Sequence, residues 1–432
     1  MMFAAAALAV ATCELDVYLA QNDTQYWSWL ITSADSARST LSLLSGTMIT
    51  LAGVVFSLTM VTLSLTSSQF GSRLLRTVIT DLTTQVGLGA FLATALYCLL
   101  VQRYIPAVEE SPFVPHLSVS VASGLALVSL AVMIWFVHHV SVAIQAQTVV
   151  AEAASELDGV IERFFSEAET EESAAQLESE SAESTVLKNT PTSTPHVLRS
   201  NSEGYLQAVD MDALEQTACE KDVTLVLGQQ LGEFIIQDSI LLHILHRKDA
   251  ATDEQERWEI DDSVKQRLNS FFLIGRDRTP HQDIANAVDN LVEIALRALS
   301  PGINDPFTAV TCIDRLAASF VRLARRRFPA ACRLNDDGEP RIVFQQVQFP
   351  ELLQQAVQPI RHHAKGSMLV AGRLMIGLDR ISQHAIRKAD REEIVRQTKC
   401  LLAEVERTTP LAEDREQVEA VARVILARHE DS

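Results

Sequence analysis

The sequence lacks the residue patterns by which enzymes and metal sites are usually recognised. Its six cysteines are scattered without a C-x-x-C pair, which indicates neither a disulfide framework nor a zinc site. It contains no G-x-S-x-G, no G-x-x-x-x-G-K, no H-E-x-x-H and no glycine-rich dinucleotide turn. We therefore predict no catalytic residue, no cofactor and no bound metal, and an enzyme is the least favoured class of function.

Positive charge is also scarce. The chain has 36 Lys and Arg against 55 Asp and Glu, a formal net charge of -19. Nucleic acids are bound by clustered Lys and Arg, so this balance argues against nucleic acid as a partner. Apolar residues are abundant instead: 47% of the chain is hydrophobic and its mean hydropathy is +0.12. Such a composition is unusual for a wholly soluble protein and points to the lipid bilayer.

Three long uncharged stretches have the length of membrane-spanning helices. They are residues 43–66, 82–102 and 117–137. With a rise of about 1.5 Å per residue, each can cross a hydrocarbon core of about 30 Å. The third closes with Trp135 and Phe136, and aromatic residues are enriched at the membrane interface. The pattern predicts a membrane α-helical protein with three transmembrane helices.

The N-terminal segment 3–13 is apolar but has only about half the length of a span. Glu14 and Asp16 follow it directly, and no Lys or Arg precedes it, which differs from a signal peptide. We expect a partial first transmembrane helix whose beginning is missing. A short interfacial helix is the alternative.

Charged residues between the spans indicate the orientation. Arg73 and Arg76 lie between the first two long spans, whereas Glu109 and Glu110 lie between the second and third. Because cytosolic loops carry an excess of Lys and Arg, we predict that the arginine-bearing loop is cytosolic. The protein is then a multi-pass membrane protein, and the chain after residue 142 lies in the cytosol.

Small and hydroxyl residues form a stripe along the first long span, at Gly46, Thr50, Gly53, Ser57 and Ser64. In lipid, such residues let helices approach closely, so the stripe predicts a packing face. The alternative is a polar lining for a pore. No Asp, Glu, Lys or Arg lies in the three spans, and intramembrane charges usually mark proton relays, so a proton-coupled transporter is disfavoured.

Composition divides the chain into four parts. Residues 1–150 form the transmembrane domain, and residues 151–200 are an acidic, Ser-rich stretch that predicts a disordered linker. Residues 201–250 predict a small β-rich subdomain, and residues 251–432 predict a helical domain. Together the last two make a mainly α, α+β cytosolic domain.

Local sequence signals predict strands and helix ends in the C-terminal half. Gly204–Val209 predicts a strand, Asp210 a helix N-cap, and residues 223–244 further strands that together suggest a small barrel. Further on, Thr279 predicts a helix N-cap and Pro301 requires that helix to end before it.

The next helix after Pro301 should begin at Asp305, an N-cap followed by Pro306. Gly302 then supplies a flexible or left-handed corner between the two helices. Polar residues gather around this corner, and Glu293 and Arg297 stand four apart in an apolar helix, so we expect them to pair.

These polar residues form either a structural network that holds the corner or a binding pocket for a small ligand or a neighbouring subunit. A structural network is the simpler interpretation, because a half-buried ion pair needs further hydrogen bonds. The candidate residues are Asp283, Asn290, Glu293, Arg297, Asn304, Asp305 and Asp314.

Three segments resemble a known family of bacterial membrane proteins, domain of unknown function 2254. They are SGTMITLAGVVFSLTMVTLSLTSSQFGSRLLR at 45–76, FVPHLSVSVA at 113–122 and EIALRALSPGINDPFTAVTCIDRL at 293–316. The resemblance covers nearly the whole chain. It implies an inner-membrane protein with a membrane-embedded N-terminal half, normally of four spans, and a cytosolic C-terminal half. It implies no activity.

Two functions follow as hypotheses. The first is a homo-oligomeric channel or passive transport-like protein, with the Gly46–Ser64 stripe near its axis and the cytosolic domain as regulator. The second is a membrane-anchored sensor or scaffold, in which the spans only anchor and the cytosolic domain binds a small ligand or a protein partner.

Overall fold

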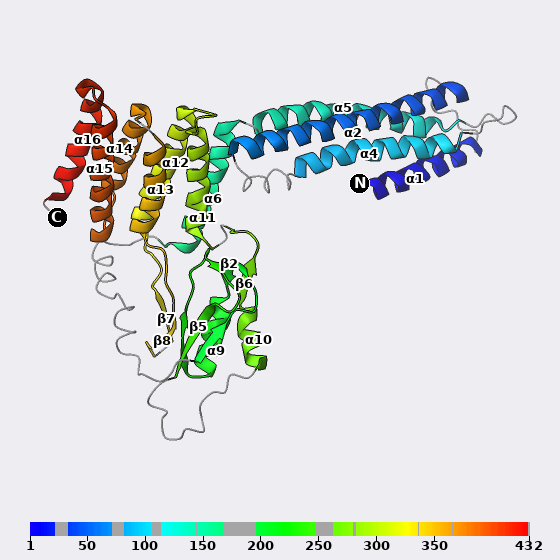
Figure 1. Ribbon diagram of the computed structural model, residues 1–432. Coiled ribbons are helices and arrows are strands. Elements are labelled where there is room, and N and C mark those ends of the chain that lie inside the picture. The colour runs from blue at the N-terminus through cyan, green and yellow to red at the C-terminus, as the bar shows by residue number, and fades with distance from the viewer. Residues whose placement is uncertain are drawn as a thin grey trace. The chain divides into compact units, whose positions relative to one another are not determined.

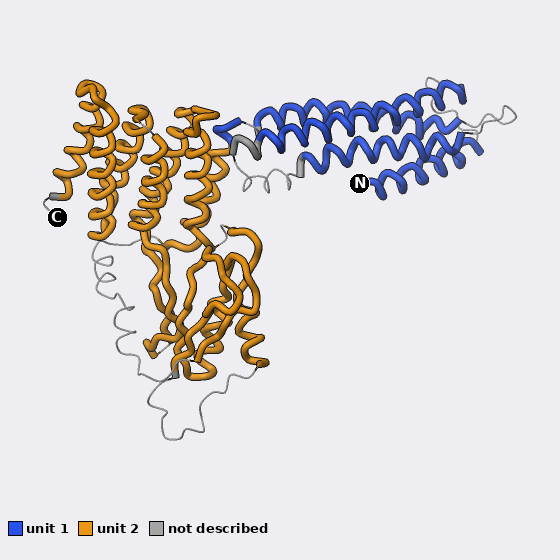
Figure 2. Tube along the Cα trace, in the orientation of Figure 1, with its two compact units in different colours: residues 1–148 blue, residues 149–432 orange. Residues whose placement is uncertain are grey.

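The computed structural model describes most of the chain as two compact units, residues 1–148 (unit 1) and 149–432 (unit 2), shown in Figure 2. The described residues are 1–21, 33–70, 82–105, 114–143, 145–166, 196–246, 262–279, 282–335, 337–364 and 366–430.

Four charged residues indicate the orientation, and all four lie outside the described residues: Arg73, Arg76, Glu109 and Glu110. The predicted linker lies outside them from residue 167 to residue 195. Its first part, residues 151–164, forms most of a helix in unit 2, and residues 196–199 near its end form a strand, so these two parts differ from the predicted disorder.

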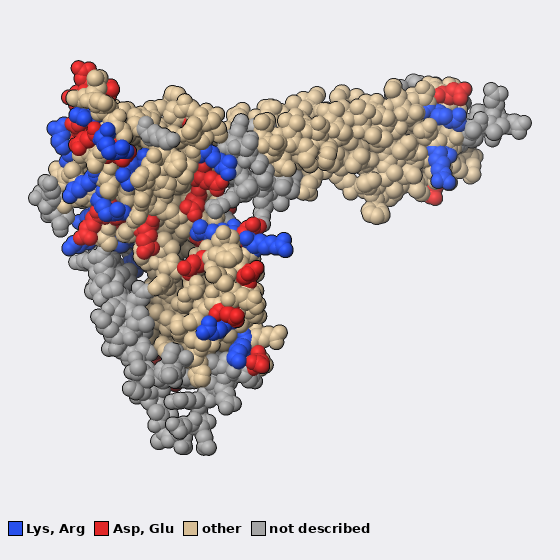
Figure 3. Space-filling view, viewed as in Figure 1, with Lys and Arg blue, Asp and Glu red and all other residues tan. Residues whose placement is uncertain are grey.

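The described part of unit 1 consists of four helices that run alongside one another (Figure 1). All four are long and apolar enough to cross a membrane. On the face shown in Figure 3, the charged residues described in unit 1 gather towards one end of the helices, as expected for a surface that faces lipid. The helices are α1 (Met2–Gln21), α2 (Ala34–Phe70), α4 (Leu82–Arg103) and α5 (His116–Ala143).

Helix α1 is longer than the predicted partial span 3–13, because it continues through Glu14 and Asp16 to Gln21. The Asp16 carboxylate is buried at the N-terminus of α5, where it accepts hydrogen bonds from the backbone N–H groups of Leu117 (3.0 Å) and Ser118 (2.9 Å). The Ser118 hydroxyl donates a third bond at 2.6 Å. A helix N-terminus has unpaired N–H groups that favour a carboxylate. This contact therefore accommodates the Asp16 carboxylate inside α1, and the helix continues past residue 13.

Helix α2 buries one face against its neighbours in unit 1. The buried residues recur at steps of three and four, which is the spacing of one helix face. They pack in two apolar clusters with residues of α1, α4 and α5. The buried face includes Leu41, Ser45, Met48, Ala52 and Val55.

Unit 2 contains almost all of α6 (Ala146–Phe164), two sheets and a layer of helices (Figure 1). The five-stranded sheet has the order β1 (His196–Arg199), β5 (Ile240–His246), β3 (Val223–Leu227), β8 (Pro340–Val343), β7 (Cys332–Leu334). The three-stranded sheet has the order β4 (Phe234–Ile235), β2 (Gly204–Val209), β6 (Phe272–Gly275).

Strands β3 and β8 are parallel, with Leu225 opposite Ile342 and Val226 opposite Val343, whereas the other recorded pairings are antiparallel. The two sheets share one apolar core with α9 (Met211–Glu220) and α10 (Asp262–Ser270). The suggested small barrel is therefore wrong: two separate sheets form, and β6, β7 and β8 come from beyond residue 250. Local alternation identifies strands but not their partners.

The helical layer contains six helices from the described residues beyond 282. Each helix packs against others close to it in the sequence: α11 contacts α12 and α13, and α14 contacts α12 and α16. The helices are α11 (Ile284–Ala298), α12 (Pro306–Ala324), α13 (Phe349–Ala364), α14 (Met368–Ser382), α15 (Lys388–Thr408) and α16 (Ala412–Glu430).

The N-caps of α11 and α12 correct one prediction and confirm another. Asp305 caps α12 through the N–H groups of Phe307 and Thr308, as predicted. Helix α11 begins at Ile284 with Asp283 as its N-cap, so Thr279 is not the cap. Arg278 holds the loop before α11 on the Asp283 carboxylate, a contact that the sequence does not reveal.

The left-handed residue of the corner between α11 and α12 is Asn304, with φ 51°, and not Gly302. Asn tolerates this conformation better than most side chains, because its short polar group bonds locally. The presence of a glycine in a turn therefore does not show that the glycine is the left-handed residue.

Candidate ligand-binding site

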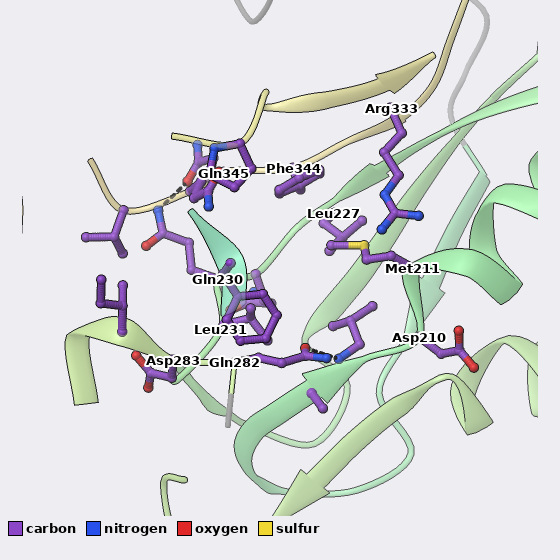
Figure 4. A pocket seen from close by; sticks show the side chains of 18 of the residues that line it. Asp210, Met211, Leu227, Gln230, Leu231, Gln282, Asp283, Arg333, Phe344 and Gln345 are labelled. Carbon is purple, nitrogen blue, oxygen red and sulfur yellow. Dashed lines mark hydrogen bonds between the residues drawn. The ribbon is translucent and has the colours of Figure 1, made fainter. Parts of the chain in front are cut away.

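Unit 2 contains a cavity of about 680 Å³, drawn in Figure 4. Residues from both sheets line it, together with the end of α6 and the start of α11. Small-molecule sites in proteins typically have volumes of about 300–1,000 Å³, so the cavity has the size of a ligand site.

The two parallel strands bring four of the cavity's polar residues together. Gln229 and Gln230 follow β3, and Gln345 and Gln346 follow β8. Because β3 and β8 are parallel neighbours, both glutamine pairs lie at the same edge of the sheet. The carboxyl ends of parallel strands are where open sheets containing such strands commonly bind ligands. A fifth glutamine, Gln282, enters from the loop before α11.

The glutamine amides make few bonds with one another. The Gln230 amide donates to Gln345 at 2.9 Å, the dashed contact between these side chains in Figure 4. Gln282 accepts from the N–H of Val209 at 3.2 Å. The buried Oε1 of Gln346 has no hydrogen-bond partner among the described residues.

The remaining wall is mostly apolar. Phe271, Phe344 and Met211 are only partly buried and pack against the core of the two sheets. Apolar walls with a few placed polar groups are typical of small-molecule sites. The apolar lining residues include Val160, Phe164, Phe165, Val209, Met211, Leu227, Leu231, Phe271, Leu273, Ile284, Phe344 and Val347.

Each charged side chain in the lining already has a bonding partner in the protein. Arg333 pairs with Asp212 and with Glu215, which lies outside the lining, at 3.0 Å. Asp210 accepts from the N–H of Ala213 as the N-cap of α9, and in Figure 4 its carboxylate points away from the cavity. The cavity therefore presents mainly amides and apolar groups, and each of its charged side chains is already hydrogen-bonded or ion-paired within the protein.

Asp283 is the most buried of these charged groups, with 3% of its surface exposed. Its carboxylate receives two bonds from Arg278, at 2.8 and 2.9 Å, and caps α11 through the N–H of Asn286. Burial raises the pKa of the Asp283 carboxyl above its usual value, and the nearby Arg278 acts in the opposite direction. Gly232, at φ +82°, passes so close that a Cβ there would collide with this carboxylate.

Helix α6 forms one wall of the cavity and is attached firmly to the helical layer. The carbonyl of Phe165 accepts from Arg326 at 2.7 Å, and that of Ser166 accepts from the N–H of Arg327 at 2.9 Å. Midway along α6, Asp158 pairs with Arg322 and accepts from Ser319. The position of α6 is thus coupled to that of α12.

The structure separates the polar residues predicted around the α11–α12 corner. Among them, Asp283 is the residue that lines the cavity. Asn290 donates to Glu156 of α6 at 3.2 Å, and Asp314 pairs with Arg373 of α14 at 3.4 Å.

The remaining members of the predicted set hold the corner locally. Glu293 and Arg297 pair at 3.0 Å as expected, with side chains 29% and 36% exposed. Asp305 caps α12, and Asn304 supplies the left-handed turn. The described contacts therefore do not join the seven residues into one network.

In unit 1, the stripe Gly46, Thr50, Gly53, Ser57 and Ser64 lies on the exposed side of α2. A Cβ added at Gly46 or Gly53 would meet nothing within 4 Å. The Thr50 hydroxyl donates to the carbonyl of Gly46 at 3.0 Å, so its bond is made within the helix. Packing of the stripe against another helix, or a role as a pore lining, stays a prediction.

Comparison with known proteins identifies the family. A family model described as predicted membrane protein (DUF2254) matches residues 1–380. The chain belongs to the DUF2254 family. The match extends over both units and includes all the residues that line the cavity.

Relatives of this DUF2254 protein occur in mycobacteria. "Uncharacterized protein Rv1290c" from Mycobacterium tuberculosis is 30% identical over 383 residues, which is 88% of this chain and 70% of the relative. "Uncharacterized protein Mb1321c" from Mycobacterium bovis gives the same identity and coverage. No solved structure matches the chain.

The cavity of this DUF2254 protein was not anticipated from its sequence, apart from Asp283. One signal was present: both VTLVL and RIV are apolar strand sequences followed closely by Gln-Gln, at 229–230 and 345–346. The signal becomes meaningful only when the two strands are known to be parallel neighbours, which the alternation of residues cannot reveal.

Proposed function

We propose that this DUF2254 protein is a membrane-anchored receptor whose unit 2 binds a small molecule in the cavity. The observation that carries the proposal is the cavity of about 680 Å³ at the carboxyl ends of two parallel strands, with apolar walls and five glutamine amides. Its size and lining match those of ligand sites, and the charged groups around it are already paired.

Helix α6 supplies a direct covalent path from the cavity to the membrane helices. Its residues Val160, Phe164 and Phe165 line the cavity. Its first residue, Ala146, follows the last residue of α5, Ala143, after a gap of two residues. A ligand that moves or stiffens the end of α6 would therefore act on the last membrane helix. For this to happen, the ligand must bind the two arrangements of α6 with different affinity.

The proposal is tested with the full chain in lipid nanodiscs. A small-molecule extract of bacterial cells, freed of macromolecules by ultrafiltration, is added, and hydrogen–deuterium exchange is followed in α6, β2 and β6. We expect the extract to slow exchange in these elements. Protection in none of them would contradict the receptor proposal.

Matched variants locate the effect. Ala330→Trp adds a large ring at an exposed residue of the lining to obstruct the cavity, and Ala331→Trp places the same ring at the next residue, which does not line it. Protection should be lost in the first and kept in the second. If Ala330→Trp is unstable without extract, Gln345→Trp replaces it, because Gln345 is an exposed lining residue. Protection that persists in Ala330→Trp, or in Gln345→Trp where that replaces it, would contradict the receptor proposal.

A channel formed by several copies is the second candidate. The observation in its favour is that the stripe with Gly46, Thr50 and Ser57 faces out of unit 1, so it can line a path only where copies of the chain meet. Ion flux through the protein in liposomes tests it, with Ser57→Leu as the blocking variant and Arg297→Ala as the control outside the membrane. Flux in no condition, or flux unchanged by Ser57→Leu, counts against this candidate.

We place unit 2 in the cytosol and the four helices of unit 1 in the inner membrane. The support is the distribution of Arg73, Arg76, Glu109 and Glu110 in the sequence. A green fluorescent protein fused after residue 432 should fluoresce, since it folds in the cytosol, and an alkaline phosphatase fused there should be inactive. The opposite result would reverse the orientation.

A further inference from the structure

We infer that the cavity takes a neutral small molecule that combines an aromatic or other apolar body with a planar amide-type edge. On such an edge an N–H donor and a hydrogen-bond acceptor lie side by side. This inference rests on the receptor function proposed above and names the chemistry of its ligand.

The charged groups of the lining disfavour an ionic ligand, because each already has a partner within the protein. Arg278 pairs with Asp283 at 2.8 Å, Arg333 pairs with Asp212 and Glu215, and Asp210 is used as the N-cap of α9. An anion would meet an excess of carboxylates, and a cation would have to compete with Arg278 and Arg333 for theirs. A neutral molecule avoids both costs.

The glutamines supply the matching polar groups. A primary amide offers two N–H donors and a carbonyl acceptor in one plane, so it pairs with a lactam, an amide or the edge of a nitrogen heterocycle through two parallel hydrogen bonds. Glutamine recognises the adenine edge in this way. Gln230 and Gln345 stand at one side of the cavity and Gln282 at another, as Figure 4 shows.

Gln346 adds an independent observation. Its Oε1 is buried and has no hydrogen-bond partner among the described residues, yet the residue lines the cavity. A buried acceptor without a partner costs folding free energy. Oε1 is shielded from solvent, so a ligand N–H reaches it only after the Gln346 side chain turns toward the cavity, and this bond would recover that cost without introducing charge.

The apolar residues determine the rest of the ligand. Phe271 and Phe344 are partly exposed and line the cavity together with Met211 and Leu231. Aromatic rings prefer offset or edge-on neighbours, and thioethers contact ring edges favourably. A planar ring therefore fits this wall better than a sugar or another fully polar body.

Three probes with the same benzene ring test the charge and the edge separately: benzamide (neutral), benzoate (anionic) and benzylamine (cationic). Binding to the full chain in nanodiscs of zwitterionic lipid is measured at pH 7 by saturation-transfer NMR with titration. We expect benzamide to bind, with benzoate and benzylamine weaker by about tenfold or more, because a site built for a neutral hydrogen-bonding edge rejects its charged analogues. Equal or tighter binding of either ion would overturn the inference.

Variants assign the binding to the amides. Gln230→Leu and Gln346→Leu should each weaken benzamide binding severalfold, and Ala330→Trp should abolish it. Gln216→Leu is the control, since Gln216 is an exposed glutamine of α9 outside the cavity. Benzamide binding that survives Ala330→Trp, or that needs neither glutamine, contradicts the inference.

The failure of this inference can be told apart from the failure of the receptor proposal. If benzamide does not bind up to its solubility limit, the ligand chemistry inferred here is wrong. The extract experiment then decides the receptor function on its own, because it assumes nothing about charge. Passing the extract over anion and cation exchangers adds a second check: protection should come from the unretained neutral fraction, and protection by a retained fraction would contradict the inference alone.

Discussion

Asp283 joins three roles in one side chain: it caps α11, pairs with Arg278 and borders the cavity. Replacing it by Ala removes the cap and leaves Arg278, whose side chain is 19% exposed, with Asp289 alone. We expect the free energy of opening of α11 amides to fall by about 2–3 kcal/mol in native-state hydrogen exchange.

The control for this variant is Asp262→Ala, in the first turn of α10. Asp262 pairs with Lys265, but its side chain is 99% exposed, so water screens the pair. No measurable change in the free energy of amide opening is expected in Asp262→Ala. A loss of the same size in both variants would show that Asp283 contributes no more than a surface carboxylate.

The raised pKa of Asp283 gives unit 2 a definite pH dependence. Between the ordinary carboxyl pKa of about 4 and the raised value, the folded state binds more protons than the unfolded state. Stability from this group therefore falls as pH rises through the raised pKa. In Asp283→Asn this slope should vanish, so the difference in α11 opening free energy between wild type and variant should change between pH 4 and neutrality. A difference that stays constant with pH would contradict the raised pKa.

Asn304 holds a left-handed conformation at the corner between α11 and α12, with φ 51°. Asn304→Ala should cost about 1 kcal/mol in the thermal unfolding of the full chain, because an alanine Cβ is strained there, and Asn304→Gly should cost little. Gly302→Ala is the control, since a Cβ at Gly302 meets nothing within 4 Å. If Gly302→Ala is the more damaging change, the corner turns at the glycine after all.

At the scale of helices, Asp16 attaches α1 to the N-terminus of α5 by three hydrogen bonds of 2.6 to 3.0 Å. Asp16→Leu should weaken the docking of α1 by about 2 kcal/mol, the usual contribution of hydrogen bonds to a charged group. Cys13 is fully buried one turn earlier, so its alkylation by N-ethylmaleimide reports undocking. We expect faster alkylation of Cys13, located by mass spectrometry.

Glu14→Gln serves as the matched change on the same helix. Glu14 is exposed, whereas Asp16 is buried, so removing its charge should leave Cys13 protected. Equal acceleration by both variants would mean that charge in this segment, and not the contact with α5, positions α1.

At the scale of the whole molecule, the apolar cores lie within single units. The core of the two sheets draws all its members from unit 2, and the two clusters around α4 draw theirs from unit 1. A compact unit with its own core can fold alone. Residues 145–432 expressed without the preceding helices should therefore unfold cooperatively on heating, followed by circular dichroism. A gradual change without a transition would show that unit 2 depends on unit 1.

Interactions between near neighbours in the chain were predictable from the sequence. Three of the four long apolar helices described follow from composition, because lipid favours uncharged stretches of sufficient length, whereas α1, which carries Glu14 and Asp16, was predicted only in part. The strand at Gly204–Val209 and the caps Asp210 and Asp305 follow from residues within one turn of each other. Family membership followed from three such segments together.

Tertiary structure alone decided the properties that join distant segments. It made β3 and β8 parallel neighbours and so brought two glutamine pairs, more than a hundred residues apart in the sequence, to one edge of a cavity. It placed Asp16 at the start of α5, and it turned the Gly46–Ser64 stripe out of the bundle. These arrangements depend on which surfaces bury each other, and hydrophobic periodicity states only that a face is buried, not against what.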